Sequence, residues 1–191
     1  GYYSMLMADA VGDSGKVFSF EPQADIFGLL QRTIIANGLE GRVSAHNVAV
    51  GAHNGEVDLA VPQFHTGGAT INATFVDDQI KVPGLDTRRV EAKTLDAALA
   101  EHVVDLVKID VEGAEALVFA GMSQLIARNP RIQIAMEIQP RFGPQQAVLL
   151  ALELDGFEVF AINYSGELHN VPYDYVRSLQ FDPMLIFRRP D

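Results

Sequence analysis

The stretch "LVKIDVEGAE", residues 106–115, decides the fold class, because an apolar, strand-forming run changes within a few residues to charges around a glycine. Similar apolar runs recur along the chain: "KVFSF" (16–20), "RVSAHNVAV" (42–50), "EVDLAV" (56–61), "RIQIAMEI" (131–138), "FEVFAIN" (157–163) and "MLIFRR" (184–189). Helical patterns separate most of them, which predicts an α/β fold with a mostly parallel sheet and helices on both faces. No strong helical pattern separates the last two runs, so we expect the sheet to end in an antiparallel pair.

The predicted helices lie at residues 2–11, 22–37, 95–100, 112–128 and 143–154, and the fourth is interrupted near Gly121. Residues 62–91 show weak periodicity and are expected to form a long loop, which in a compact domain is usually functional or mobile. The length of 191 residues suits a single domain over residues 1–191.

The composition excludes several kinds of function. The net charge of −11 comes from 25 acidic and 14 basic residues, which argues against nucleic acid as a partner. No apolar run approaches the ~20 residues of a membrane span, so no membrane partner is expected. The sequence has no cysteine, and a cytoplasmic location is the default. The absence of cysteine excludes disulfides and thiol nucleophiles, and the five histidines show no metal-binding spacing, so no metal site is predicted.

Three carboxylates lie where predicted strands end. Glu21 follows "VFSF", Asp110 follows "LVKI", and Glu137 lies near the end of "IQIAM". In parallel sheets the ligand crevice lies beyond the carboxyl ends of the strands. The charges of "KIDVEGAE" are therefore expected where the strand leaves the core and meets this crevice.

Glu21 is the clearest candidate for ligand binding. It lies twenty residues after Gly1, across a helix and a strand. An acid about that far beyond a glycine turn is where a nucleotide ribose is usually held, because a carboxylate accepts hydrogen bonds from two neighbouring hydroxyls. The alternative is a solvated turn residue before Pro22.

The other charged residues near the strand ends have two interpretations each. Asp110 could bind a ligand cation or metal or act as a base, or it could cap the helix expected from Glu112. Glu137 interrupts an apolar strand and is a site candidate, unless it pairs with Lys108 on the adjacent strand. For Lys108 we favour a structural salt bridge with a neighbouring acid, and we expect Glu115 on a helix surface.

Two histidines lie in or near the predicted site segments. His65 precedes "TGG" (66–68) in the long loop, where a histidine could serve as a base, although an exposed side chain without a function is more common. His46 lies inside a predicted strand and is expected to be packed.

Taken together, several stretches resemble the FkbM-type methyltransferases, a branch of the Rossmann-like methyltransferases that use S-adenosylmethionine. The matching stretches are "GYYS" (1–4), "VFSFEP" (17–22), "NGLEGRV" (37–43), "NVAVG" (47–51), "KTLD" (93–96), "DLVKIDVEGAE" (105–115) and "MEIQP" (136–140). Proteins of this family begin with a strand and a glycine-rich loop that runs into "GYYS", and Gly1 corresponds to the last glycine of that loop. The resemblance therefore implies a piece of a longer protein, without the first strand and the glycine loop.

The resemblance also implies roles for individual residues. Glu21 would hold the cofactor ribose, and Asp110 would lie near the reacting methyl group. The adenine would be flanked by Pro22, Asn47, Val48 and Ala49, and the start of the first helix would touch the cofactor through Gly1, Tyr2, Tyr3 and Ser4. The loop at residues 65–70 would help to cover the acceptor, a sugar or natural-product hydroxyl. Its proton would pass to Asp110, His65 or Glu137.

Three functions follow from these observations. The first is S-adenosylmethionine-dependent O-methylation, in which a cation held by Asp110 and Glu137 is the less favoured variant because no third ligand is evident. The second is an NAD(P)-dependent oxidoreductase on a related fold, for which Glu21 would be equally suitable; "KIDVEGAE" and the final strand pair argue against it. The third is a methyltransferase-like domain without catalytic activity. The sequence carries no signal for an oligomeric state.

Overall fold

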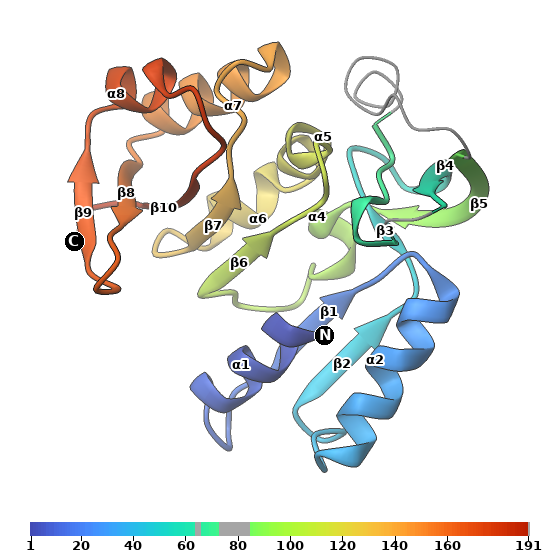
Figure 1. Ribbon diagram of the computed structural model, residues 1–191. Helices are drawn as coiled ribbons and strands as arrows, with labels where there is room; N and C mark the ends of the chain where they lie inside the picture. The colour runs from blue at the N-terminus through green and yellow to red at the C-terminus, as the bar shows by residue number, and fades with distance from the viewer. Residues whose placement is uncertain (64–65, 73–84, 191) are drawn as a thin grey trace.

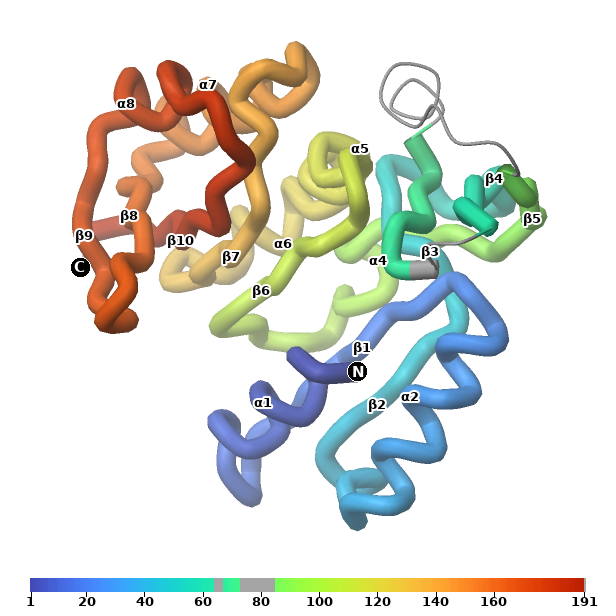
Figure 2. The backbone as a smooth tube through the Cα atoms, in the orientation of Figure 1, coloured from blue at the N-terminus to red at the C-terminus, as the bar shows by residue number. Residues whose placement is uncertain are grey.

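The computed structural model describes residues 1–63, 66–72 and 85–190 (Figures 1 and 2). The helices are α1 (Tyr2–Ala10), α2 (Ala24–Ala36), the 3-10 turn η1 (Thr66–Gly68), α4 (Leu95–Ala98), α5 (Glu115–Ala120), α6 (Ser123–Arg128), α7 (Gly143–Leu154) and α8 (Tyr173–Ser178). The strands are β1 (Val17–Phe20), β2 (Val43–His46), β3 (Ala49–Val50), β4 (Gly55–Pro62), β5 (Leu85–Lys93), β6 (Leu106–Ile109), β7 (Gln133–Glu137), β8 (Glu158–Ile162), β9 (Leu168–Val171) and β10 (Met184–Arg188).

The α/β class is confirmed, but the described residues form three sheets instead of one mostly parallel sheet. Their strand orders are β1-β2, β6-β7-β10-β8-β9 and β3-β5-β4. The pairs β1–β2, β3–β5 and β6–β7 are parallel, and the other pairs are antiparallel. The predicted antiparallel ending is confirmed, since β10 inserts between β7 and β8 and runs against both.

Helices cover both faces of the β1–β2 sheet. Val17 and Val43 pack with Ala8 of α1 and with Leu30 and Ile34 of α2 in one apolar cluster. Because neighbouring side chains of a strand point to opposite faces, the aromatic residues of β1 face the other way. There Phe18 and Phe20 pack against the main core, which contains Leu95, Leu99 and the buried faces of α5, α6 and α7.

Several elements differ from the prediction. Residues 42–50 form two strands that belong to different sheets, and the run predicted as a loop ends in β5, which pairs with β4 from Leu85 to Ala92. β5 was missed because its charged side chains are exposed and paired across the strands, for example Arg89 with Asp58 at 3.0 Å. β9 and α8 between the last two predicted strands were also missed. No described helix has the length and apolar character needed to cross a membrane.

The sheets leave two edges facing each other. Among the described strands, β1 pairs only with β2, and β6 pairs only with β7. The N-terminus lies beside β1, on the side toward β6 (Figure 1). A cavity opens between these edges. It includes the carboxyl ends of β1 and β6, where the sequence predicts the ligand site.

Candidate functional site

A cavity of about 920 Å³ lies between β1 and β6 and is also lined by the start of α1 and by Gly67, Ala69, Thr70 and Ile71. Its walls include residues 17–20 of β1 and residues 106–109 of β6. This volume is typical of small-molecule sites, which usually enclose about 300–1,000 Å³.

The cavity brings together most of the predicted cofactor-binding residues. It is lined by Gly1, Tyr2, Tyr3, Ser4, Glu21, Pro22, Ala49 and Asp110. Three predicted residues lie outside its lining: Asn47, Val48 and Glu137. His65, the predicted loop base, lies outside the described residues. Glu21, Ala49 and Asp110 thus come from distant parts of the chain to one cavity.

Glu21 is held at the end of β1 by its own backbone and by the turn into α2. Its N–H donates to the carbonyl of His46 at 3.0 Å, and its Oε1 accepts a hydrogen bond from the N–H of Gln23 at 2.8 Å. Burial raises the pKa of the Glu21 carboxyl above its ordinary value, and the bond from Gln23 partly opposes this shift. Glu21 therefore supports the turn with one oxygen and keeps the rest of its carboxylate at the cavity.

Asn47 and Val48, the other residues predicted to flank the adenine, do not line the cavity between β1 and β6. The Nδ2 of Asn47 donates to the carbonyl of Glu21 at 2.8 Å and to the carbonyl of Pro22 at 3.2 Å. Asn47 thereby fixes the backbone that carries Glu21. Val48 is buried and points into a second cavity, described below.

Asp110 and Lys108 form an ion pair on the cavity wall. Lys108 Nζ lies 3.1 Å from Asp110 Oδ2 and 4.8 Å from the centre of the Tyr3 ring. The Lys108 side chain is 9% exposed, whereas that of Asp110 is 42% exposed. The predicted salt bridge of Lys108 is confirmed. The helix-cap alternative for Asp110 is wrong, because α5 begins at Glu115 with Ala114 as its N-cap residue.

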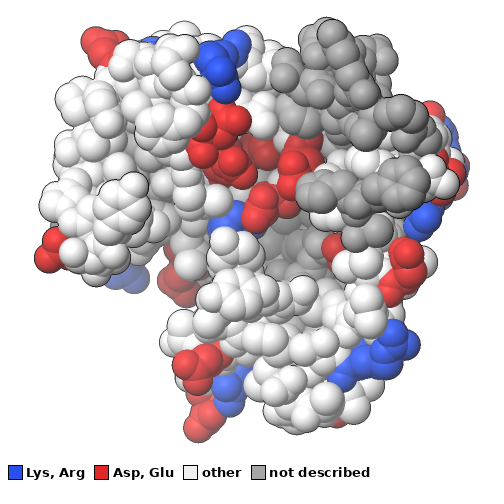
Figure 3. Space-filling view, in the orientation of Figure 1, with Lys and Arg blue, Asp and Glu red and all other residues white. Residues whose placement is uncertain are grey.

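Glu137 lies at the end of β7 among other acids. Burial raises its pKa most, the negative charges of Asp110, Glu112 and Asp182 raise it further, and the positive charge of Lys108 opposes them. Figure 3 shows acidic side chains gathered around the hollow over the carboxyl ends of β6 and β7. Within residues 1–63, 66–72 and 85–190, no group of three or more residues is arranged to hold a metal ion.

The structure places Glu115 in the interior, so its predicted position on a helix surface is wrong. The residue is 3% exposed and contacts Gln145, which is 0% exposed. The spacing carried a signal, because Glu115 lies three and seven residues before the buried Val118 and Met122. Sequence reasoning missed Gln145 as well, although it shares the buried face of α7 with Leu149 and Leu152.

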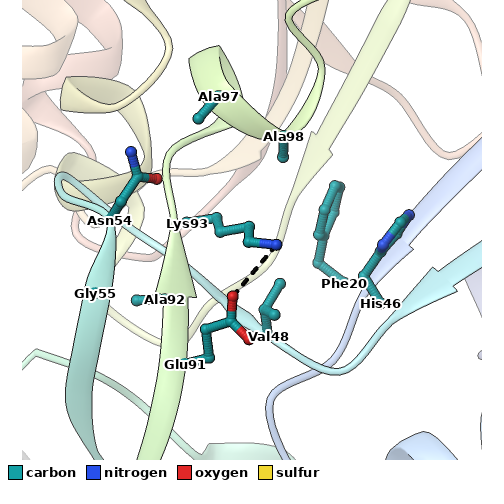
Figure 4. Close-up of a pocket in the computed structure, with 10 residues that line it drawn as sticks. All are labelled: Phe20, His46, Val48, Asn54, Gly55, Glu91, Ala92, Lys93, Ala97 and Ala98. Atoms are coloured by element: carbon teal, nitrogen blue, oxygen red, sulfur yellow. Dashed lines mark ion pairs between the residues drawn. The ribbon is translucent and has the colours of Figure 1, made fainter.

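A second, smaller cavity of about 360 Å³ is lined by residues of β5 and α4 and by the last residues of β1 and β2, Phe20 and His46 (Figure 4). The rings of Phe20 and His46 stack there at 5.2 Å, and Lys93 pairs with Glu91 at 3.3 Å. Burial, and next the charge of Lys93, lower the pKa of His46. Only Val48 among the predicted site residues lines this cavity, so the one between β1 and β6 is the candidate site.

Comparison with known proteins identifies a structure of similar fold and a matching family. The chain is similar to a crystal structure of methyltransferase FkbM from Methylobacillus flagellatus KT, with a TM-score of 0.59 and 16% sequence identity. The alignment covers 97% of this chain but 40% of that protein, and at this identity it supports the fold alone. The sequence matches no curated protein. The family described as "Methyltransferase FkbM domain" matches residues 1–176 of the 191, and the chain therefore belongs to the FkbM methyltransferase family.

Proposed function

We propose that this chain is the catalytic domain of an S-adenosylmethionine-dependent methyltransferase that methylates a hydroxyl group of a sugar or natural product. One observation carries the proposal: Glu21 and Asp110, which directly follow β1 and β6, line one cavity with Ala49 of β3 and with Gly1, Tyr2, Tyr3 and Ser4. The cofactor would supply an electrophilic methyl group on a sulfonium cation.

The residues of the cavity fit the parts of such a cofactor. The carboxylate of Glu21 suits the two ribose hydroxyls, and Pro22 and Ala49 would border the adenine. We place the methionine part near Gly1 and the start of α1. The acids around Asp110 and Glu137 favour a cation, because opposite charges attract strongly in a partly buried site.

The chain would accelerate methyl transfer mainly by holding the acceptor hydroxyl in line with the methyl group. A hydroxyl must also lose its proton. Glu137 lies outside the cavity lining but within range of the charge of Asp110, which lines it. Its raised pKa, closer to the pH at which a general base works best, makes it one candidate to take the proton. Asp110 is a second candidate, and His65 is a third that lies outside the described residues.

Calorimetry with the full-length protein tests the proposed function without knowledge of the acceptor. We expect binding of S-adenosylhomocysteine and no binding of NAD. Tight binding of NAD would instead favour an oxidoreductase, and binding of neither would favour a domain without catalytic activity. This experiment does not bear on the predictions that the protein binds neither nucleic acid nor membranes and is cytoplasmic.

The raised pKa of Glu21 gives a pH dependence. Hydrogen bonds from ribose hydroxyls favour the charged carboxylate, so the bound ligand lowers the pKa that burial raises in the free protein. Binding then releases a proton, and the affinity for S-adenosylhomocysteine should fall as the pH drops through the raised pKa, above the ordinary 4.5. Calorimetry over a pH series measures this. Glu21→Gln should flatten that part of the profile, and an unchanged slope would assign it to another group.

A further inference from the structure

A buried pair of side chains connects the two strand ends that carry the acidic candidates. Glu115 Oε1 accepts a hydrogen bond from the N–H of Gly113 at 3.2 Å, and Glu115 Oε2 accepts one from Gln145 Nε2 at 2.7 Å. Gln145 Oε1 in turn accepts a hydrogen bond from the N–H of Gln139. A continuous chain of hydrogen bonds thus runs from the loop after β6, through the interior, to the segment after β7.

The loop on one side of this pair has an unusual backbone. Glu112 has φ of 51° and Gly113 has φ of 84°. A left-handed conformation is ordinary for glycine but uncommon for a glutamate, and it persists where surrounding contacts hold it. The bond between Gly113 and Glu115 is such a contact. It fixes the turn by which the chain leaves Asp110.

Burial of a carboxylate is costly unless hydrogen bonds satisfy it. Burial raises the pKa of Glu115, and the backbone N–H groups of Glu115, Gly113 and Val111 oppose that shift. The Gly113 N–H and Gln145 Nε2 each donate a hydrogen bond to this carboxylate, one to each oxygen. An apolar pair could fill the same space, but it could not hold the loop and the end of β7 in register.

We propose that Glu115 and Gln145 are positioning residues that set Asp110 and Glu137 against the cofactor sulfonium and the acceptor. The loop bonded to Glu115 begins at Asp110, and the N–H bonded to Gln145 belongs to Gln139, two residues after Glu137. One buried pair is therefore bonded to the segments that directly follow both acids. This inference rests on the proposed function, because it assigns the two acids to the reacting end of the cofactor.

The hydrogen-bond pattern permits an exchange of the two side chains. In Glu115→Gln/Gln145→Glu, residue 115 still accepts from Gly113 and now donates to residue 145, which still accepts from Gln139. The net charge is unchanged. Each single variant, Glu115→Gln or Gln145→Glu, instead places two amides or two carboxylates against each other. Gln133→Glu, at the exposed opposite end of β7, is the control for the change of charge.

The test compares dissociation constants for S-adenosylmethionine, a cation at sulfur, with those for S-adenosylhomocysteine, which lacks that charge. The ratio of the S-adenosylmethionine constant to the S-adenosylhomocysteine constant is the quantity compared. We expect each single variant to raise this ratio about 10-fold, which is a loss of ~1.4 kcal/mol in the relative binding of the cation. Affinity for S-adenosylhomocysteine should change little, because Glu21 remains in place. The double variant should return the ratio to within about 3-fold of the parent, and Gln133→Glu should leave it unchanged.

Amide hydrogen exchange separates this inference from the proposed function. The N–H groups of Gly113 and Gln139 should lose protection in the single variants and regain it in the double variant. If the parent protein binds neither ligand, the proposed function is wrong. The positioning role of Glu115 and Gln145 in catalysis is then wrong as well, whatever the amide hydrogen exchange shows. If the ligands bind but the ratio stays constant in the single variants, or is not restored by the double variant, the pair has no positioning role.

Discussion

Gly121→Ala is expected to lower the free energy of unfolding by about 3 kcal/mol, at the upper end of what overpacking costs. A Cβ at this position would lie 2.1 Å from the carbonyl oxygen of Gly51 and 3.2 Å from Thr94 Cβ. Neither backbone can move away freely. The Gly51 N–H donates to the carbonyl of Lys93 at 3.1 Å, and the Gly121 carbonyl accepts from the N–H of Asp96 at 3.0 Å. Chemical denaturation followed by circular dichroism measures the loss.

Gly28→Ala is the matched control, because it is the same substitution inside helix α2. A Cβ there meets no atom within 4 Å. Alanine is a better helix former than glycine, so this variant should gain about 0.5–1 kcal/mol. Equal effects of the two variants would show that the contact between Gly121 and Gly51 is not as close as the structure has it.

Gly121 also shows how far the sequence could predict the fold. A helix interrupted near this glycine was predicted, and α5 and α6 are separated there. The reason was not predictable, since the close approach involves Gly51, seventy residues earlier in the chain. Apolar periodicity located the helices that have one buried face, such as α2 and α7. It could not locate β5, where charge pairs on an exposed surface replace the apolar alternation.

The candidate site shows a similar division. The positions of Glu21 and Asp110 followed from the rule that ligands bind beyond the carboxyl ends of strands, and both line the cavity. The partner of Lys108 was left open among neighbouring acids, because pairing depends on side-chain direction and sheet register. Lys108 lies opposite Ala135 in the ladder and pairs with Asp110, the residue that directly follows its own strand. Glu115 was misplaced because a charged residue is usually exposed, and its buried partner Gln145 lies thirty residues away.

Glu21→Ala is expected to weaken the binding of S-adenosylhomocysteine by about 1–3 kcal/mol, the range for lost hydrogen bonds to a charged group. This corresponds to about 5- to 150-fold in the dissociation constant. The ribose hydroxyls would lose a carboxylate acceptor that the Gln23 N–H holds directly and whose backbone is held by Asn47, which donates to the carbonyl of Glu21. Isothermal calorimetry measures the loss directly.

Two controls make the result specific to Glu21. Glu40→Ala removes an exposed acid far from the cavity lining, and it should leave the affinity unchanged. Asn47→Ala keeps the carboxylate but removes the two bonds that fix its backbone, so its loss should be smaller than that of Glu21→Ala. A folded Glu21→Ala protein that binds S-adenosylhomocysteine as tightly as the parent would remove Glu21 from the site. The cavity between β1 and β6 would then have to hold its ligand by other groups, because no other predicted residue supplies a carboxylate beside Pro22 and Ala49.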